Sequence, residues 1–411
     1  MSTPRSERLE TNRPQRHRRQ PLPRRTQLLT IGVIALIVAL TGGVAWVYSL
    51  VPGQRTCPVS TAAAIVPDSG VLFGVNLDWQ TENLTQYGDS LRHPPAVATQ
   101  FSDLPYDAQH WDWIASAAVQ ARSANSVLLL TLEPNEGLAA VTDEVVSRLV
   151  TDLRGLNDQG VPIVLRFAHE MNGTWYAWSQ QPTAYIATFR KVSAAVHQGA
   201  PGTAMMWAPN YGGGYPFAGG AYLAKPGTKN FAILDTNHDG VLSMADDPYL
   251  PYYPGDDAVD WVGMSVYHWG NKHPWGANAI PEDGKFAAML TGTYSGSIGN
   301  ETAVPDFYAI FAEQHHRPMA VTETAAFYAP TRGGADERAI KEAWWRQVFS
   351  PEMPQRFPML KMINWFEWNK FEVEVGEQVD WRALGTATTR DAFVAALPSW
   401  LHYGGTPPAC P

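Results

Sequence analysis

Short hydrophobic runs alternate with segments of helical periodicity along most of the chain after residue 70. Apolar residues recur at three- and four-residue spacing in Thr142–Leu156, Pro182–His197 and Asp336–Phe349, which predicts amphipathic helices. Eight strands in alternation with helices predict an α/β fold, a (β/α)8 TIM barrel over residues 70–411, with its active site where the strands end. The eight runs that have the character of buried strands are Val71–Val75, Ala96–Phe101, Val127–Leu132, Val161–Phe167, Thr203–Trp207, Val259–Val266, Pro318–Thr322 and Met359–Trp365.

A second pattern lies inside the Gly-, Pro- and Tyr-rich segment 210–254, which is too long for a simple connection. Residues 235–246 have the spacing of a calcium-binding loop, with Gly240 at its sixth position. Position 12 is Asp where Glu is usual, and there is one copy, which favours a structural Ca²⁺ over a sensor and leaves a metal-free turn as the alternative. The expected ligands are Asp235, Asn237, Asp239, the carbonyl of Val241, and Asp246.

The N-terminus differs from the rest of the chain. Residues 1–27 include eight Arg and several Pro, which predicts a disordered cytoplasmic tail. Residues 28–51 carry no charge and are long enough to span a bilayer of about 30 Å, so they predict a transmembrane signal-anchor, with a cleaved signal peptide and a secreted protein as the alternative. The positive-inside rule then places the linker 52–69 and the barrel outside the cytoplasm in a single-pass membrane protein.

Charge and cysteine content agree with an extracytoplasmic domain. The chain has a net charge of −9, and without the first 25 residues it has 22 basic and 37 acidic residues, a net of −15. Such a domain is a poor partner for nucleic acid and compatible with a neutral polymer. Cys57 and Cys410 are the two cysteines, and they predict a disulfide that joins the ends of the barrel, with two free thiols as the alternative.

Two strand-like runs end in carboxylates. Leu165–Phe167 leads to Glu170, and Arg317–Thr322 leads to Glu323. Two carboxylates at strand ends in one pocket are sufficient to cleave a glycosidic bond. Arg166 lies four residues before Glu170, and it is expected to point inward and to keep Glu323 ionised. Trp175 and its aromatic neighbours offer flat apolar faces that suit a sugar ring.

Several ordered motifs resemble glycoside hydrolase family 26, a family known for β-mannanases. The matching segments are Arg166-Phe-Ala-His-Glu170-Met-Asn-Gly-Thr-Trp175, Met206-Trp-Ala-Pro-Asn210, Tyr252-Tyr-Pro-Gly-Asp-Asp-Ala-Val-Asp260-Trp-Val-Gly263 and Val321-Thr-Glu323-Thr. The resemblance covers most of residues 70–385. Ala325 stands where the family usually has Gly, and its methyl is expected to narrow the floor of the site.

The resemblance implies a retaining mechanism with Glu170 as acid/base and Glu323 as nucleophile. It also implies that His169 binds a hydroxyl or a carboxylate, that Tyr267 orients the nucleophile, and that Trp365 is the platform under the scissile sugar. Burial and the charge of Glu323 are expected to keep Glu170 protonated near neutral pH.

These observations predict a membrane-anchored, extracytoplasmic endo-β-glycanase, a monomer that needs no catalytic cofactor. β-1,4-Mannan is the expected polysaccharide substrate, and mixed-linkage β-glucan and β-1,3-xylan are the alternatives. The competing hypothesis from another class is an inactive glycan-binding protein of the cell envelope. Two glutamates beside Arg166 disfavour it, because a binding module needs no matched acid and nucleophile.

Overall fold

The computed structural model of the chain describes residues 57–272, 275–296 and 304–405. Its contacts separate Met1–Arg55 from Thr56–Pro411, and the architecture below belongs to the second unit. Among the described residues, no helix has the length and apolar character to span a bilayer. The basic tail and the apolar span at 28–51 lie outside the described residues, so both stay predictions.

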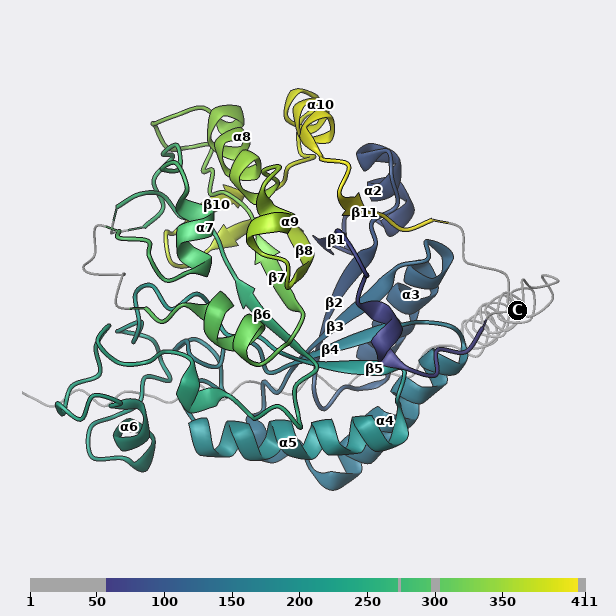
Figure 1. The fold of residues 1–411 in the computed structure, drawn as a ribbon, viewed down its shortest axis with the longest axis vertical. Coiled ribbons are helices and arrows are strands. Elements are labelled where there is room, and N and C mark those ends of the chain that lie inside the picture. Colours follow the sequence, from purple (N-terminus) through teal and green to yellow (C-terminus); the bar gives the residue numbers. More distant parts are fainter. Residues whose placement is uncertain (1–56, 273–274, 297–303, 406–411) are drawn as a thin grey trace, which may run out of the picture. The chain divides into compact units, whose positions relative to one another are not determined.

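The eight predicted strands form a closed parallel barrel (Figure 1). Each strand pairs in parallel with the next, and β8 returns to β1 over a register that runs from Leu72 opposite Met362 to Leu77 opposite Glu367. The barrel prediction is therefore confirmed. The strands are β1 Val71–Leu77, β2 Val97–Asp103, β3 Val127–Glu133, β4 Ile163–Phe167, β5 Thr203–Trp207, β6 Trp261–Ser265, β7 Met319–Thr324 and β8 Leu360–Glu367.

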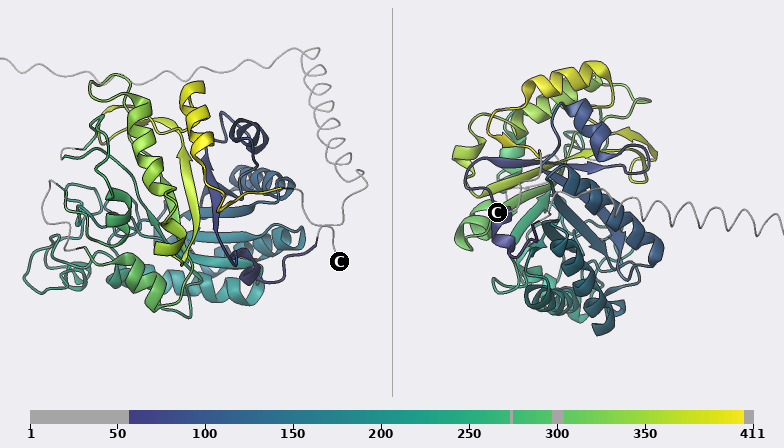
Figure 2. Two further views of the ribbon diagram at one scale, coloured as in Figure 1. Left: turned by 45° about the horizontal axis from the view of Figure 1, so that its top comes forward. Right: turned by 90° about the vertical axis from the view of Figure 1, so that its right-hand side faces the viewer.

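Helices surround the barrel (Figure 2). The three predicted ones are present, and Thr142 and Asp336 cap the first and third by accepting hydrogen bonds from backbone amides of the first turn. The α-helices are α2 Leu84–Leu91, α3 Ala108–Ser123, α4 Asp143–Asp158, α5 Pro182–Gly199, α6 Lys229–Leu234, α7 Lys285–Leu290, α8 Glu337–Val348, α9 Met353–Arg356 and α10 Ala387–Ala396. Shorter elements are η1 Ala62–Ile65, η2 Leu138–Ala140, η3 Leu250–Tyr252, the π-helix η5 Tyr308–Gln314, the hairpin β9 Asn369–Glu372 with β10 Glu377–Asp380, and β11 Leu401–His402.

Alternate residues of each strand belong to two separate cores. One set of alternate residues forms an inner core that fills the barrel. The other set forms the core between the barrel and the helices. Because the side-chain period of a strand is two, membership in the inner core fixes which later residues of the same strand point to the barrel axis. The inner core includes Val97, Val127, Leu129, Val164, Ala204, Met206, Trp261, Ala320 and Met362.

Part of the segment expected to be a linker packs against the barrel. The amide of Val59 donates to the carbonyl of Asn157, and the amide of Ala62 donates to the carbonyl of Pro201. Ile65 is buried and joins the inner core. Residues 59–65 therefore cover the end of the barrel where the strands begin, opposite the end where Glu170 and Glu323 lie.

Candidate active site

Arg166 lies at the centre of the carboxyl end of the barrel. It follows Val164 of the inner core by two residues on β4, so its side chain points inward, where it is fully buried. Its Nη1 donates to Oε1 of Glu323 at 2.5 Å, and its Nη2 donates to Oγ of Ser265 at 3.0 Å. The expected contact between Arg166 and Glu323 is present.

Glu323 is held on both carboxylate oxygens. Oε1 accepts from Arg166, and Oε2 accepts from the hydroxyl of Tyr267 at 2.6 Å. Burial and the charge of Glu323 raise the pKa of Tyr267 well above its usual value, so the phenol keeps its proton and remains a donor. These two hydrogen bonds fix the orientation of the Glu323 carboxylate.

Glu170 follows β4 in a constrained turn. Ala168 and Glu170 have φ of 48° and 52°, a left-handed conformation that residues other than Gly seldom adopt. The amide of Glu170 donates to the carbonyl of Ala208 at 2.9 Å, and the indole of Trp178 donates to the carbonyl of His169 at 2.7 Å. The turn persists because contacts from neighbouring segments hold it, which is typical of functional sites.

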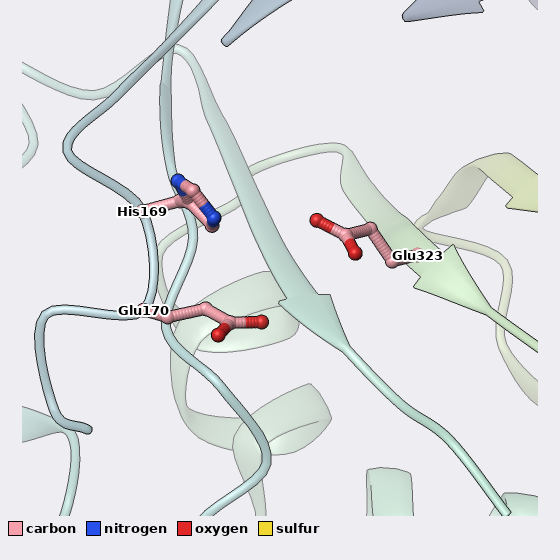
Figure 3. A group of neighbouring side chains, drawn as sticks. All are labelled: His169, Glu170 and Glu323. Atoms are coloured by element: carbon pink, nitrogen blue, oxygen red, sulfur yellow. The ribbon is translucent and has the colours of Figure 1, made fainter. Parts of the chain in front are cut away.

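The carboxyl groups of Glu170 and Glu323 point toward each other (Figure 3). One oxygen of Glu170 lies within 4.8 Å of an oxygen of Glu323. Burial, followed by the charge of Glu323, raises the pKa of Glu170 to about 7, although Arg166 opposes this shift. Trp175 donates its indole N–H to Oε2 of Glu170 at 3.0 Å. The pair therefore combines a carboxyl that can carry a proton at neutral pH with one that is fixed by two donors.

His169 completes a group of three possible metal ligands with the two glutamates. Its Nε2 lies 3.2 Å from the hydroxyl of Tyr176, and burial together with the charge of Arg166 lowers its pKa well below the usual value, so the ring is neutral. Both oxygens of Glu323 already accept hydrogen bonds. The arrangement fits hydrogen bonding to a sugar better than metal coordination, because a metal would have to displace these donors.

The aromatic residues after Glu170 divide into two kinds. Trp175 is 38% exposed, and its ring meets Phe217 edge-on at 5.1 Å, so one face is accessible at the site. Trp178 is fully buried and stacks on Tyr176 at 4.3 Å. Of these aromatics, Trp175 is the one positioned to contact a ligand, and Trp178 supports the turn.

Trp365 is not at the site, and its assignment as a sugar platform is wrong. Its side chain is fully buried and packs against Phe393 at 5.1 Å and Phe349 at 6.1 Å, between barrel and helices. The side chain of Phe366 points to the opposite face of β8, and its ring centroid lies 5.7 Å from that of Tyr267. β8 is buried on both faces, so hydrophobicity alone gave no indication of which residue points inward.

Ala325 follows the end of β7 and is fully buried. The expectation that its methyl narrows the floor of the site stays a prediction.

Three inward-pointing residues were missed by the sequence analysis. Ser265 accepts from Arg166, and Phe101 meets His169 edge-on at 5.8 Å. Glu133 ends β3 two residues after Thr131, one residue beyond the strand predicted at 127–132. Counting alternate positions back to Val127 and Leu129 would have found it.

The calcium-loop segment forms a turn with part of the expected geometry. Gly240 has φ of 84°, and the carboxylate of Asp235 accepts from the amides of Asp239 and Gly240. Asp246 instead uses one oxygen for the amide of Thr236 at 2.7 Å and the other for that of Ser243 at 2.9 Å. Asp235 and Asp246 both accept from backbone amides of this turn, and the calcium-ligand roles of the five expected residues stay a prediction.

The expected disulfide includes a residue that the structure does not describe. Cys57 lies at the start of the described residues and Cys410 lies outside them. The bond between them stays a prediction.

Comparison with known proteins finds similarity to one family. The family model "Glycosyl hydrolase family 26" matches residues 99–208, which include β2 to β5 and Glu170. Endoglucanase H of Acetivibrio thermocellus is 25% identical over 191 residues, which are 43% of this chain and 18% of that protein. A β-1,3-xylanase of Alcaligenes sp. is 21% identical over 311 residues, 70% of this chain and 52% of that protein. The chain thus spans about half, or less, of the length of these two relatives.

Solved structures agree on the fold. The catalytic domain of a family 26 endo-β-1,4-mannanase from Bacillus sp. JAMB-750 superposes with a TM-score of 0.52 at 15% identity, over 85% of this chain and 92% of that domain. A second structure, GH26C from Muricauda sp. MAR_2010_75, superposes with a TM-score of 0.52 at 14% identity, over 82% of this chain and 87% of that chain. The chain is therefore similar to glycosyl hydrolase family 26 over residues 99–208, and its closed barrel has the fold of these solved structures.

Proposed function

We propose that this protein is a retaining endo-β-glycanase that acts outside the cytoplasm on a β-linked polysaccharide. The observation that carries the proposal is the pair of Glu170, with its pKa raised to about 7, and Glu323, fixed by Arg166 and Tyr267, with oxygens within 4.8 Å. Retaining enzymes place their carboxyl groups about 5–5.5 Å apart, whereas inverting enzymes need about 6.5–9.5 Å to admit water. The short separation supports retention.

In the first step, a carboxylate oxygen of Glu323 forms a bond to the anomeric carbon while the bond to the glycosidic oxygen breaks. Glu170 gives its proton to that leaving oxygen. In the second step, Glu170, now ionised, takes a proton from water, and the water oxygen displaces Glu323 from the anomeric carbon. The hydrogen bond from Tyr267 and the ion pair with Arg166 aim the same carboxylate in both steps.

β-1,4-Mannan is the leading substrate, with mixed-linkage β-glucan and β-1,3-xylan as alternatives. The named relatives comprise an endoglucanase, a β-1,3-xylanase and an endo-β-1,4-mannanase, so they support a β-glycan and leave the sugar open. Reducing-sugar release from a panel of mannan, β-glucan and xylan tests the proposal. No release from any member, with binding retained, would favour the glycan-binding alternative.

The proposed location is the cell membrane, with the N-terminal span as anchor and a monomeric barrel outside. The uncharged length of residues 28–51 and the preceding arginines support it. The full chain should sediment with membranes after an alkaline wash, and a chain that begins at residue 52 should not. If the full chain is expressed and a shorter protein that begins near residue 52 is released into the medium, the N-terminal segment is cleaved instead. A tethered enzyme of this kind could trim a polysaccharide that the cell exports.

A further inference from the structure

A third carboxyl group, that of Glu133, points to the catalytic centre from the end of β3. Val127 and Leu129 of this strand belong to the inner core, so Thr131 and Glu133 share their inward direction. Thr131 is paired with Arg166 across β3 and β4, which places Glu133 just beyond the guanidinium, toward the open end of the barrel. The charges of Arg166, Glu323 and Glu170 all act on its carboxyl.

The surroundings of Glu133 are those of a binding position. Its neighbour across the strands, Asp103, is held by the side-chain amide of Asn135 at 2.8 Å. The half-buried Glu133 carboxyl has no such hydrogen-bond or ion-pair partner among the residues that the structure describes. Phe101, on the inward face of β2, presents an apolar ring beside His169.

A half-buried carboxyl that has lost part of its hydration without gaining a protein donor is destabilised in its charged form. A ligand hydroxyl can supply the missing partner, because a carboxyl group either accepts from a hydroxyl or, when protonated, donates to it. Since Glu133 lies on the inward face of β3, just beyond the residue paired with Arg166, that hydroxyl belongs to the sugar chain in the site.

On this basis we propose that Glu133 is a substrate-binding residue that recognises a hydroxyl group of the bound glycan, with Phe101 as the adjacent apolar wall. The inference rests on the proposed glycanase function and deepens it. Because the hydroxyls of epimeric sugars point in different directions, a single carboxyl at this place contributes to the choice among mannan, glucan and xylan.

The electrostatics of the site agree with this role. Burial raises the pKa of Glu133 to about 7, Arg166 opposes the rise, and the charges of Glu323, Asp103 and Glu170 add to it. The charge of Glu133 also contributes, after burial and the charge of Glu170, to the raised pKa of the Tyr176 phenol. Near neutral pH the carboxyl can therefore donate or accept, which suits a hydroxyl partner that does both.

Binding and kinetics of matched variants test the proposal. In a Glu323→Ala background, which removes turnover, Glu133→Ala should weaken the affinity for an oligosaccharide of the preferred substrate about tenfold, the size expected for one lost hydrogen bond. In the active enzyme, Glu133→Ala should raise KM by a similar factor while kcat stays within about threefold. Glu133→Gln keeps the shape and both hydrogen-bonding roles and should recover most of the affinity.

Glu136→Ala is the matched control, because Glu136 is exposed on the loop that follows the same strand. It should leave affinity and KM unchanged. Equal affinity in the Glu323→Ala and Glu133→Ala/Glu323→Ala variants would overturn the role of Glu133 while the glycanase function stands. A fall in kcat by orders of magnitude with unchanged KM would overturn it too, in favour of a catalytic role. If the Glu323→Ala protein binds no member of the panel, the glycanase proposal itself fails, and this inference with it.

Discussion

At the residue scale, the two glutamates differ in what surrounds their carboxyl groups. Glu323 accepts from a cation and a phenol, whereas Glu170 has one indole donor and lies in a buried environment next to a like charge. This difference supports the proposed roles of Glu323 as nucleophile and Glu170 as acid, because an ionised attacker and a protonated donor are both needed at one pH.

The Glu323→Ala variant should lose several orders of magnitude in turnover, because the covalent step is removed. Azide, which is small enough to enter the vacated space, should restore turnover with an activated substrate and give the inverted α-glycosyl azide. The anomeric configuration of this product, measured by NMR, checks the assignment. Turnover close to that of the wild type would exclude Glu323 as the nucleophile.

The Glu170→Ala variant should separate substrates by leaving group. Aryl glycosides with acidic phenols need no proton, so their first step should survive, whereas cleavage of the polysaccharide should fail. Pre-steady-state release of the phenol measures the first step directly. Equal loss on both kinds of substrate would count against Glu170 as the acid.

The raised pKa of Glu170 also links catalysis to stability. Because its pKa is about 7 in the folded state and near 4.5 when unfolded, ionisation costs stability as pH rises through this window, and the full cost is present above about pH 7. Glu170→Gln should therefore raise the melting temperature by a few degrees at pH 8 and by little at pH 4. Calorimetry at the two pH values checks this, and a gain confined to pH 4 would contradict the assigned direction. In the wild type, kcat should fall as pH rises past about 7.

At the element scale, the turn at 235–246 can be held by a metal or by its own hydrogen bonds. The structure shows the second arrangement for Asp246, whose oxygens accept from backbone amides on both sides of the turn. The exposed Asp239 and the left-handed Gly240 keep the features of the calcium motif. A calcium ion therefore remains a proposal for this segment.

If the loop binds calcium, millimolar Ca²⁺ should raise the melting temperature of the barrel by a few degrees and chelation should reverse the effect, since binding to the folded state stabilises by mass action. Asp235→Ala and Asp239→Ala should abolish the response. An exposed acid elsewhere, Asp158→Ala, serves as control. A melting temperature that changes with neither calcium nor chelator would leave the segment as a metal-free turn.

At the scale of the whole molecule, the closed barrel has one end that contributes to stability and an opposite end that carries the candidate active site. The end where strands begin is covered by residues 59–65, and the other end carries the reactive groups. Substitutions at Ile65 are therefore expected to affect stability, and those at Glu323 activity, which matches the usual division of labour in barrels of this kind.

A bond between Cys57 and Cys410 would close a loop of about 350 residues and could stabilise the domain by roughly 5 kcal/mol in the chain-entropy model. The reduced barrel domain should melt several degrees lower than the oxidised one. Activity at moderate temperature should change little, because neither cysteine belongs to the described site. Peptide mapping under non-reducing conditions decides the matter, and two alkylatable thiols in protein from an oxidising compartment would refute the bond.

The sequence by itself determined the barrel and the central part of the site. Strand positions followed from hydrophobic runs of the right length, and the inward direction of Arg166 followed from the alternation of side chains along a strand. The facing of Glu170 and Glu323 followed from one rule, that parallel strands in a closed barrel end at the same rim.

Only the tertiary structure decided the register and partners of groups whose local sequence is uninformative. Trp365 and Phe366 are neighbours on a strand buried on both faces, so hydrophobicity does not distinguish them, and only packing against Phe393 turns the tryptophan outward. Asp246 accepts from the backbone amides of Thr236 and Ser243, contacts that the path of the loop provides and the motif spacing does not show. The alternation along β3 gives the inward direction of Glu133, whereas its place beside Arg166 depends on the pairing of β3 with β4 in the barrel.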